Sequence, residues 1–274
     1  MMVSYTDYNK LPNIYTGDIR IYDEEAFKAM RIIGKITAQC LDELAYIIKP
    51  GITTLDIDNY IFQFAFRNKV LPATLGYRGY KYSCCTSSNH IVCHGMPSSK
   101  ILKEGDIINV DVTFILNGWH GDSSRMYPVG KLKPAAKRLL KVTYNSLMRG
   151  IEAVKPGNTT GDIGGAIEKY VLSEKCSVVK DFCGHGIGLL FHDTPNILNY
   201  RARGEEIVLK PGMIFTIEPM VNLGDSRVKI LPDGWTAVTK DKSLSAQYEH
   251  TLAVTETGYE IFTNSRNGTF FIEG

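Results

Sequence analysis

The first residues that could do chemistry are two aspartates on a predicted β-hairpin. Apolar and polar residues alternate from Ile107 to Leu116, and the Asn117-Gly118 pair that follows is typical of a two-residue hairpin turn. Residues 119–127 then form the return strand. The register set by this turn places Asp122 directly opposite Thr113.

Asp111 lies two residues from Thr113, so it points to the same face of the hairpin as the diagonal neighbour of Asp122. Like charges placed together on a sheet destabilise it unless a cation or a shared proton compensates them. A bound metal ion would meet that need. The hairpin alone leaves a second interpretation open, in which one aspartate caps a turn and the register is shifted.

An internal repeat favours the metal interpretation. Two pairs of matching segments occur at spacings of 106 and 107 residues, namely Lys49–Ile57 with Lys155–Ile163 and Leu102–Ile107 with Leu209–Ile214. This agreement predicts two similarly built halves, about residues 23–130 and 131–262. In the second half Glu218 takes the position of Asp111, among apolar neighbours where a bare charge would be costly. Pseudo-symmetry would then aim both carboxylates at one central site.

Three histidines and one further acid could complete such a site. His185 stands among glycines in residues 184–188, His94 and His192 each precede a proline by three residues, and Glu249 follows strand-forming residues. A single histidine is more often a hydrogen-bonded core residue, and a single strand glutamate is often exposed, so only the whole set carries weight. The glycines of residues 184–188 do not fit a phosphate-binding loop, because they match neither G-x-G-x-x-G nor G-x-x-x-x-G-K-[ST]. Four acids with one histidine suit two divalent ions better than one ion.

The elements that must position these residues follow from the spacing of apolar side chains. Steps of three and four predict amphipathic helices across Asp23 to Ile48 and across Leu139 to Val154, each ended by a Pro-Gly pair. Thr54 and Thr160 have the character of N-caps for second helices, about residues 55–68 and 161–174. No linker separates the halves, so we expect one catalytic α+β domain over residues 1–274.

Composition limits the class of protein. The 274 residues are 44% hydrophobic and 22% charged, with a mean hydropathy of -0.10, as in ordinary globular proteins. A formal net charge of +2 predicts neither specific DNA binding nor attraction to a membrane surface. The six cysteines contain no C-x-x-C pair, and neither a secretory segment nor a long apolar run is present. We therefore expect a cytoplasmic protein with reduced thiols.

Taken in order, these motifs make the sequence resemble the type I methionine aminopeptidases over nearly its whole length. The stretches that carry the resemblance are Leu75–Tyr80, Val92–Pro97, Asn109–Thr113, His120–Asp122, Gly184–Gly188, Phe191–His192, Phe215–Pro219 and Ser245–His250. The resemblance implies the pita-bread fold, in which two pseudo-symmetric halves surround a central antiparallel sheet. It also implies removal of the N-terminal methionine from nascent proteins and peptides that have a small second residue.

The resemblance further implies the roles of the acids and of His185. Asp111 would bind one divalent ion, His185 and Glu218 would bind the other, and Asp122 and Glu249 would bridge both. Glu218 would also be the general base. Divalent ions lower the pKa of a bound water and polarise a carbonyl group, which suits hydrolysis near neutral pH. Cobalt, manganese, iron and zinc all accept such ligands, so the sequence does not predict which ion acts in the cell.

By the same resemblance, His94 and His192 face the substrate and do not bind metal. His192 would contact the carbonyl oxygen, where negative charge develops, and His94 would contact the scissile amide nitrogen. The expected walls of the methionine pocket are Tyr77, Tyr80, Cys85, Phe191 and Trp235. Without the resemblance, these residues would be interpreted as ordinary core side chains.

Two positions depart from the family pattern and could change substrate specificity, and a group of basic residues could bind a partner. Thr74 stands where many relatives have cysteine, and His90 replaces an acidic residue. Four basic residues lie between Glu218 and Glu249, namely Arg227, Lys229, Lys240 and Lys242. They form either a solvated loop or a surface that docks transiently on the ribosome. We expect a monomer of the short bacterial type.

Two other functions fit parts of the pattern. A peptidase that cleaves X-Pro bonds would use the same five ligands, but such chains usually carry an extra N-terminal domain, for which this sequence has no room. A non-catalytic binding protein with the same fold would have lost ligands, whereas all five are present here.

Overall fold

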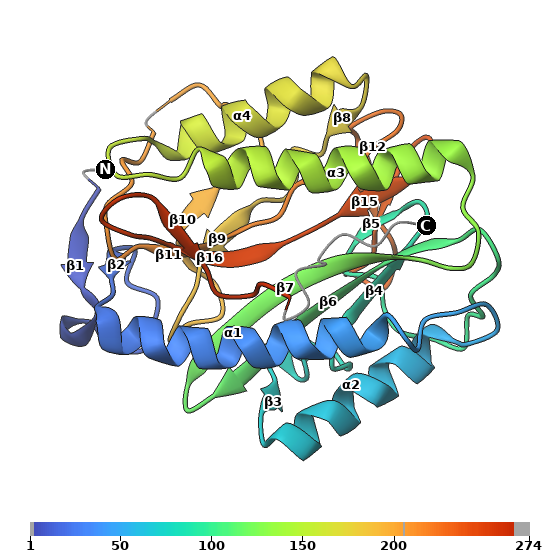
Figure 1. Cartoon of the computed structure of the whole chain (residues 1–274), viewed down its shortest axis with the longest axis horizontal. Helices are drawn as coiled ribbons and strands as arrows, with labels where there is room; N and C mark the ends of the chain where they lie inside the picture. Colours follow the sequence, from blue (N-terminus) through green and yellow to red (C-terminus); the bar gives the residue numbers. More distant parts are fainter. Residues whose placement is uncertain (1–2, 205, 266–274) are drawn as a thin grey trace.

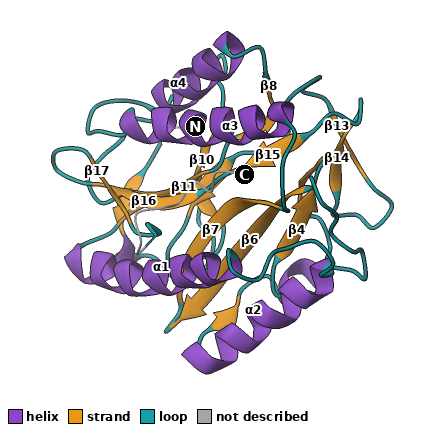
Figure 2. Ribbon diagram, turned by 45° about the vertical axis from the view of Figure 1, so that its right-hand side comes forward, coloured by secondary structure: helices purple, strands orange, loops and turns teal. Residues whose placement is uncertain are grey.

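Two pairs of helices enclose a set of mostly antiparallel strands (Figure 1). The computed structural model describes residues 3–204 and 206–265. In the first half, α1 (Glu24–Leu44) and α2 (Thr54–Asn68) lie on one side of the strands, and in the second half α3 (Pro134–Glu152) and α4 (Thr160–Ser173) lie on the other (Figures 1 and 2). This arrangement matches the expected α+β class and the expected pair of similar halves.

The helix starts differ slightly from the sequence prediction. The N-caps of α2 and α4 are Thr53 and Thr159, one residue earlier than the predicted Thr54 and Thr160. Each capping hydroxyl accepts from the backbone N–H three residues later, and the aspartate there accepts from the cap residue in return. The hydroxyl of Thr54 instead donates to the carbonyl of Ser98 at 3.0 Å. In each pair of neighbouring threonines, either residue could be the N-cap by its local preference. Contacts with other parts of the fold decide which one is.

The first helix is shorter at its end than the sequence predicts. α1 starts after Asp23, whose side chain accepts from Ala26 N, and it ends at Leu44 and not at Ile48. Residues 45–47 form turns before the Pro50-Gly51 break, because the last helical bonds are replaced by short-range ones such as Ile47 N to Leu44 O at 3.0 Å.

The predicted hairpin is present in the predicted register. β6 (Ile107–Leu116) and β7 (Trp119–Pro128) pair antiparallel, and Thr113 lies directly opposite Asp122. Asn117 and Gly118 both have positive φ, at 51° and 86°, as a two-residue turn of this type requires. The alternative of a shifted register is therefore wrong.

Two further strands pair with β6 in the sheet of this hairpin, and the others form small antiparallel sheets, apart from a parallel pair at the N-terminus. The pair is β1 (Tyr5–Asp7) with β2 (Ile19–Ile21), and the first half adds β3 (Leu71–Pro72), β4 (Cys85–Ser88) and β5 (Ile91–Cys93). The second half contains β8 (Ser177–Val178), β9 (Gly184–Gly186), β10 (Asp193–Ile197), β11 (Ile214–Ile217), β12 (Met220–Asn222), β13 (Val228–Ile230), β14 (Ala237–Thr239), β15 (Ser245–Gln247), β16 (His250–Val254) and β17 (Tyr259–Ile261). Five of them make one sheet in the order β10-β9-β11-β16-β17.

The two halves are joined where β7 meets the start of β16. Ser123 donates its hydroxyl to the carbonyl of Glu249 at 2.7 Å, and the N–H of Glu249 donates to the carbonyl of Ser124 at 3.0 Å. Thr251 donates its hydroxyl to the carbonyl of Asp122 at 2.6 Å. These bonds lock the strand that carries Asp122 against the strand that follows Glu249, so the fold itself brings the two acids together.

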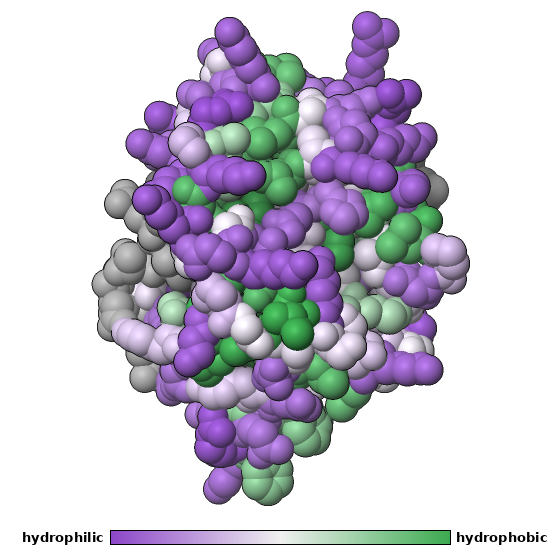
Figure 3. All heavy atoms as spheres, turned by 90° about the vertical axis from the view of Figure 1, so that its right-hand side faces the viewer, coloured by the Kyte–Doolittle hydropathy of each residue, from purple (hydrophilic) through white to green (hydrophobic). Residues whose placement is uncertain are grey.

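Each half has its own buried apolar cluster beneath its helices. In the first half, for example, Phe64 of α2 stacks on Phe114 of β6 with ring centroids 5.7 Å apart. On the face drawn in Figure 3, hydrophilic side chains surround smaller apolar areas, which is the usual surface of a globular protein. Among the helices of the described residues, none is long and apolar enough to cross a membrane.

Candidate active site

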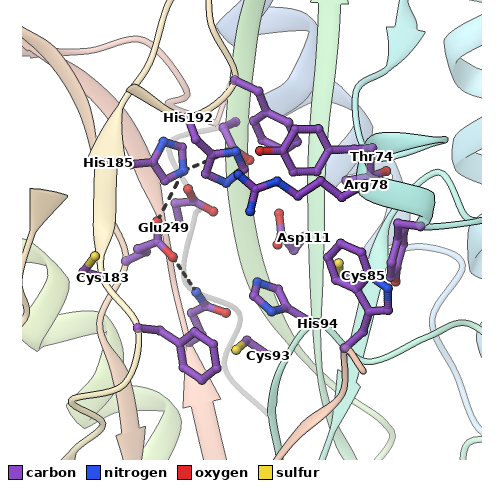
Figure 4. A pocket seen from close by; sticks show the side chains of 18 of the residues that line it. Thr74, Arg78, Cys85, Cys93, His94, Asp111, Cys183, His185, His192 and Glu249 are labelled. Atoms are coloured by element: carbon purple, nitrogen blue, oxygen red, sulfur yellow. Dashed lines mark hydrogen bonds and ion pairs between the residues drawn. The ribbon is translucent and has the colours of Figure 1, made fainter. Parts of the chain in front are cut away.

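A cavity of about 850 Å³ opens between the two halves and contains every residue that the sequence singled out for chemistry. The acids Asp111, Asp122, Glu218 and Glu249 and the histidines His94, His185 and His192 line it, together with Tyr77, Tyr80, Cys85, Phe191, Trp235 and Thr74. Figure 4 shows His94, His192 and Arg78 projecting into the same space as Asp111 and Glu249. The tertiary structure therefore brings together residues from both halves of the chain.

The side chains with metal-ligating atoms form a tight group. Asp122, His185 and Glu249 offer ligand atoms that all lie within 4.8 Å of one another. The Nε2 atom of His185 is 3.7 Å from Oδ2 of Asp122 and also 3.7 Å from Oε1 of Glu218. Asp111 faces the same cavity from the strand paired with that of Asp122. Three of the five predicted ligands thus form one group, Glu218 lies beside His185, and Asp111 lines the same cavity.

Hydroxyl and amide groups orient these ligands. Thr113 donates to Oδ1 of Asp122 at 2.7 Å, and Thr216 donates to Oε1 of Glu218 at 2.8 Å. The other carboxylate oxygen of Glu218 accepts from Nε2 of Gln247 at 3.2 Å. The carboxylates of Asp122 and Glu218 are therefore held in fixed orientations at the wall of the cavity.

The glycines around His185 serve strand packing. A Cβ on Gly184 would lie 2.3 Å from the carbonyl oxygen of Thr216, and one on Gly186 would lie 2.0 Å from that of Thr194. β9 can pass between β10 and β11 at this distance only without side chains at those two positions. The close packing of β9 against its two neighbouring strands fixes the position of His185. It also explains why glycines surround His185, so no phosphate-binding loop is needed to account for them.

Burial makes the metal-free site electrostatically unfavourable. Asp122 and Glu249 are buried, and Asp111 and Glu218 are half-buried. Loss of solvation raises the pKa of Asp111 to about 7. Loss of solvation, followed by repulsion from the neighbouring carboxylates, raises the pKa values of the other three acids well above their usual range.

This donor set fits divalent cations. Among the residues that the structure describes, no lysine or arginine forms an ion pair with any of the four acids. Burial lowers the pKa of His185 to about 4, so its imidazole is neutral at physiological pH and has a lone pair to offer. Several carboxylates with one neutral imidazole are the ligands expected for borderline and hard divalent ions.

The other two histidines lie beside aromatic rings in the same cavity. His192 stacks on Tyr77 with centroids 5.2 Å apart, and its ring is 4.2 Å from that of His185. Loss of solvation, together with the nearby His185 and Arg78, lowers the pKa of His192. His94 lies 5.4 Å from Phe182, and burial lowers its pKa. Both are therefore neutral at physiological pH and can donate one N–H each.

The aromatic residues among the predicted pocket walls form two ring pairs that line the same cavity. Tyr80 packs against Trp235 with centroids 5.0 Å apart, and Tyr77 packs against Phe191 at 5.0 Å. The hydroxyl of Tyr80 contacts the carbonyls of Cys84 and Gly95 at 3.1 and 3.2 Å. Its polar end is thus satisfied by the backbone, and its ring is left as a rigid apolar surface of the cavity.

The two departures from the family pattern lie in different places. Thr74 lines the cavity, and its hydroxyl donates to the carbonyl of Tyr82 at 2.9 Å. His90 is not among the described residues that line it. Burial and the nearby Lys100, Lys242 and Lys229 lower the pKa of His90, so this residue lies in a basic region away from the site.

Sequence reasoning missed several lining residues. These are Tyr15, Arg78, Cys93, Asp181, Phe182, Cys183, Asp193, Asn196, Met220, Gly234 and Gln247. Most stand next to a recognised motif, and proximity to the motif would have found them. Gln247, for example, belongs to the Ser245–His250 stretch. Tyr15 carries no such signal, because it is far along the chain from every motif.

Comparison with known proteins identifies the class. The family model for metallopeptidase family M24 matches residues 28–256, which is most of the chain. The chain therefore belongs to metallopeptidase family M24, and it has the pita-bread fold of its structural neighbours. A prolidase from Pyrococcus furiosus has the same fold, with a TM-score of 0.70, but is only 22% identical and extends well beyond this chain, which covers 65% of it.

Within that family, the high identities are to methionine aminopeptidases. The methionine aminopeptidase of Rickettsia prowazekii is 51% identical over 90% of this chain and 96% of its own length, and that of Escherichia coli K12 is 46% identical over 92% and 96%. The crystal structure of the Rickettsia enzyme superimposes with a TM-score of 0.88 over 89% of this chain and 99% of that chain. The chain is thus grouped with the methionine aminopeptidases of the family.

Proposed function

We propose that this chain removes the N-terminal methionine from nascent proteins and peptides by metal-dependent hydrolysis, with a preference for a small second residue. The observation that carries the proposal is the convergence of four carboxylates and the neutral His185 in one cavity beside an aromatic pocket. Relatives that are 46–51% identical over most of the chain are named methionine aminopeptidases. Divalent metal use follows from membership of a metallopeptidase family together with this donor set.

We assign two ions to the site. Asp111 would hold one ion and His185 with Glu218 the other, while Asp122 and Glu249 would bridge them. The 3.7 Å distances from His185 to Asp122 and to Glu218 support a shared site. Cobalt, manganese, iron and zinc are all compatible with these ligands. Divalent ions bound here would lower the pKa of a water molecule and polarise the scissile carbonyl group.

The chain's own residues then handle the protons and the developing charge. Glu218 accepts a proton from the attacking water, and Thr216 and Gln247 keep its carboxylate in position for this step. His192 donates an N–H to the carbonyl oxygen as that atom becomes negative. Glu218 returns the proton to the leaving amide nitrogen, and His94 would contact that nitrogen. Peptide and water are consumed, and free methionine and the shortened peptide are released.

The residues assigned to the methionine pocket select the first residue of the substrate. Tyr77, Tyr80, Cys85, Phe191 and Trp235 would enclose the methionine side chain with apolar surface and soft sulfur contacts. The free amino group lies beside the acids, so a blocked or internal methionine is not a substrate. If His94 lies next to the second residue of the substrate, it would exclude large side chains at that position.

We also propose that the enzyme is a single-domain, cytoplasmic monomer. The four basic residues interpreted as either a solvated loop or a surface that docks on the ribosome lie on and around the β13–β14 hairpin. Arg227 there is paired with Asp225, whereas Lys229 and Lys242 lie near His90 and Lys100. Contact with ribosomal RNA remains a prediction, which cosedimentation of the protein with ribosomes at low and high salt would test.

The direct test is an assay on metal-stripped enzyme with Met-Ala-peptides. Chelation should abolish hydrolysis, and divalent ions added back one at a time should restore it to different extents. Matching X-Pro peptides are the control for the related peptidase class. Full activity in protein shown to be metal-free by elemental analysis, or faster cleavage of X-Pro than of Met-Ala, would overturn the proposal.

A further inference from the structure

The N-terminal segment reaches the active-site cavity although it contains none of the motifs. Tyr15 lines the same cavity as His192 and Glu218. The family model starts at residue 28, so this segment lies outside the matched part of the chain. We infer that Tyr15 contacts the substrate peptide at its third residue or later, and so increases the affinity of the enzyme for longer peptides. The inference rests on the proposed function and adds a specificity element to it.

A buried arginine fixes the backbone next to Tyr15. Arg20 is 2% exposed, and its Nη2 donates to the carbonyl oxygens of Pro12 and Ile14, both at 2.8 Å. Its Nε donates to Oδ2 of Asp193 at 2.6 Å, and Asp193 is 6% exposed. One guanidinium therefore ties the residue that precedes Tyr15 to the residue that follows His192. Breaking a buried pair of this kind is costly, so the connection is a firm one.

Further contacts attach the segment on the other side of Tyr15. The hydroxyl of Thr194 donates to the carbonyl of Asp18 at 2.7 Å, which joins the segment to β10 a second time. The N–H of Ile19 donates to the carbonyl of Ser4 at 2.8 Å, and β1 pairs with β2 in parallel. Tyr15 is thus held from both sides on a segment that is bonded to the strand after His192.

The exposure of Tyr15 places it at the mouth of the cavity. Its side chain is 66% exposed, whereas the residues assigned to the methionine pocket are buried or half-buried. It shares the cavity lining with Asp193 and Asn196, which follow His192 along the chain. If His192 lies at the scissile carbonyl, the lining residues Tyr15, Asp193 and Asn196 offer the rest of the peptide a path toward solvent. A tyrosine ring offers a large, rigid contact surface at low entropic cost, and its hydroxyl can bond to a peptide carbonyl.

The test compares Tyr15→Ala with Ile14→Ala on substrates of two lengths. Ile14 is a matched control because it is adjacent, is 63% exposed and is not among the described residues that line the cavity. For a Met-Ala-Ser-based hexapeptide, Tyr15→Ala should raise KM by roughly three- to tenfold with little change in kcat. For the dipeptide Met-Ala, both variants should match the unaltered protein. Tyr15→Phe should retain most of the affinity, since it keeps the ring.

The outcomes separate this inference from the proposed function. If the unaltered protein cleaves Met-Ala but Tyr15→Ala leaves the KM of the hexapeptide unchanged, the contact does not exist and only the inference is overturned. An equal rise in KM for Ile14→Ala, or an equal rise for the dipeptide, would also overturn it, since neither reflects a contact with the distal peptide. If metal-loaded protein cleaves neither substrate, the proposed function itself fails.

Discussion

Thr113 and Asp122 face each other across the β6–β7 hairpin, and the Thr113 hydroxyl donates to Oδ1 of Asp122 at 2.7 Å. This bond joins a residue with no charge of its own to an acid that we propose as a metal ligand. Its position follows from the Asn117-Gly118 turn, because that turn sets which residues are paired. The hairpin therefore orients a ligand as well as supplying it.

Replacing Thr113 with valine removes this hydrogen bond while keeping a similar shape. We expect Thr113→Val to weaken metal binding by roughly 10- to 100-fold, as loss of a group that orients a ligand does elsewhere. Metal titration of the stripped protein, followed by activity, measures the effect. Thr113→Ser keeps the hydroxyl and should bind metal nearly normally. Equal losses in both variants would mean that packing, and not the hydrogen bond, matters at this position.

Metal removal should make folding stability depend on pH. Burial raises the pKa of Asp111 to about 7, and the pKa values of Asp122, Glu218 and Glu249 are also raised. The unfolded chain releases these protons near pH 4, so the folded metal-free protein binds more protons between about pH 4 and 7. The four acids should therefore lower the free energy of unfolding as the pH rises through that range, whereas His185, His192 and His94, whose pKa values are lowered, raise it.

Thermal unfolding at pH 5.5 and 7.5 measures this effect. Excess divalent ion should raise the Tm of the chelated protein more at pH 7.5 than at pH 5.5, because it binds only the folded site and competes with protons for the carboxylates. Without metal, raising the pH from 5.5 to 7.5 should lower the Tm of the unaltered protein relative to that of Asp111→Asn, because the variant lacks one of the buried acids. An equal change of Tm with pH in both metal-free proteins would contradict the burial argument.

Glu218→Gln should cause a large loss of turnover. The amide removes a ligand charge and the group that accepts the proton, and loss of a general base alone costs roughly 10²- to 10⁴-fold. Single-turnover rates with saturating metal separate weak metal binding from slow chemistry. Turnover like that of the unaltered enzyme would place the base elsewhere.

For His192→Ala the loss should appear mainly in kcat. A contact that strengthens as charge develops acts on the transition state more than on the bound substrate, and such a donor contributes roughly 10²- to 10³-fold. Measurement of kcat and KM with one Met-Ala-peptide distinguishes the two effects. Because His192 is open to the cavity, the variant should keep its Tm. A change confined to KM would contradict the assigned role.

Specificity for the second residue should follow its size. Met-X-peptides in which X is Gly, Ala or Ser should be cleaved well, and those with Lys, Leu or Phe poorly, if His94 limits the space beyond the scissile bond as proposed. One methylene in a pocket changes the free energy by only about 1–3 kcal/mol, whereas a clash with a fixed ring excludes larger groups more strongly. His94→Ala should reduce the difference in cleavage rate between the peptides in which X is Ala and those in which X is Leu. Cleavage that does not depend on X would show that the second subsite is open.

The sequence predicted those features that depend on local geometry. The hairpin register followed from a two-residue turn, and the helices followed from apolar spacing. The spacing of the repeat also related Glu218 to Asp111, although the two residues are far apart in the chain. The helix starts were wrong by one residue, at Thr53 and Thr159, because neighbouring threonines have the same local preference. The end of α1 was also placed too late, because apolar spacing continues beyond Leu44 into turns.

The tertiary structure decided which distant residues share the cavity. Gln247 orients Glu218, Arg20 connects Asp193 to Pro12 and Ile14, and Tyr15 reaches the mouth from a segment without a motif. Each of these contacts depends on how separate helices, strands and loops pack. The spacing of apolar residues along the chain does not show which distant residues will come into contact. The pKa shifts have the same origin, because the loss of solvation at the four acids exists only when both halves close around them.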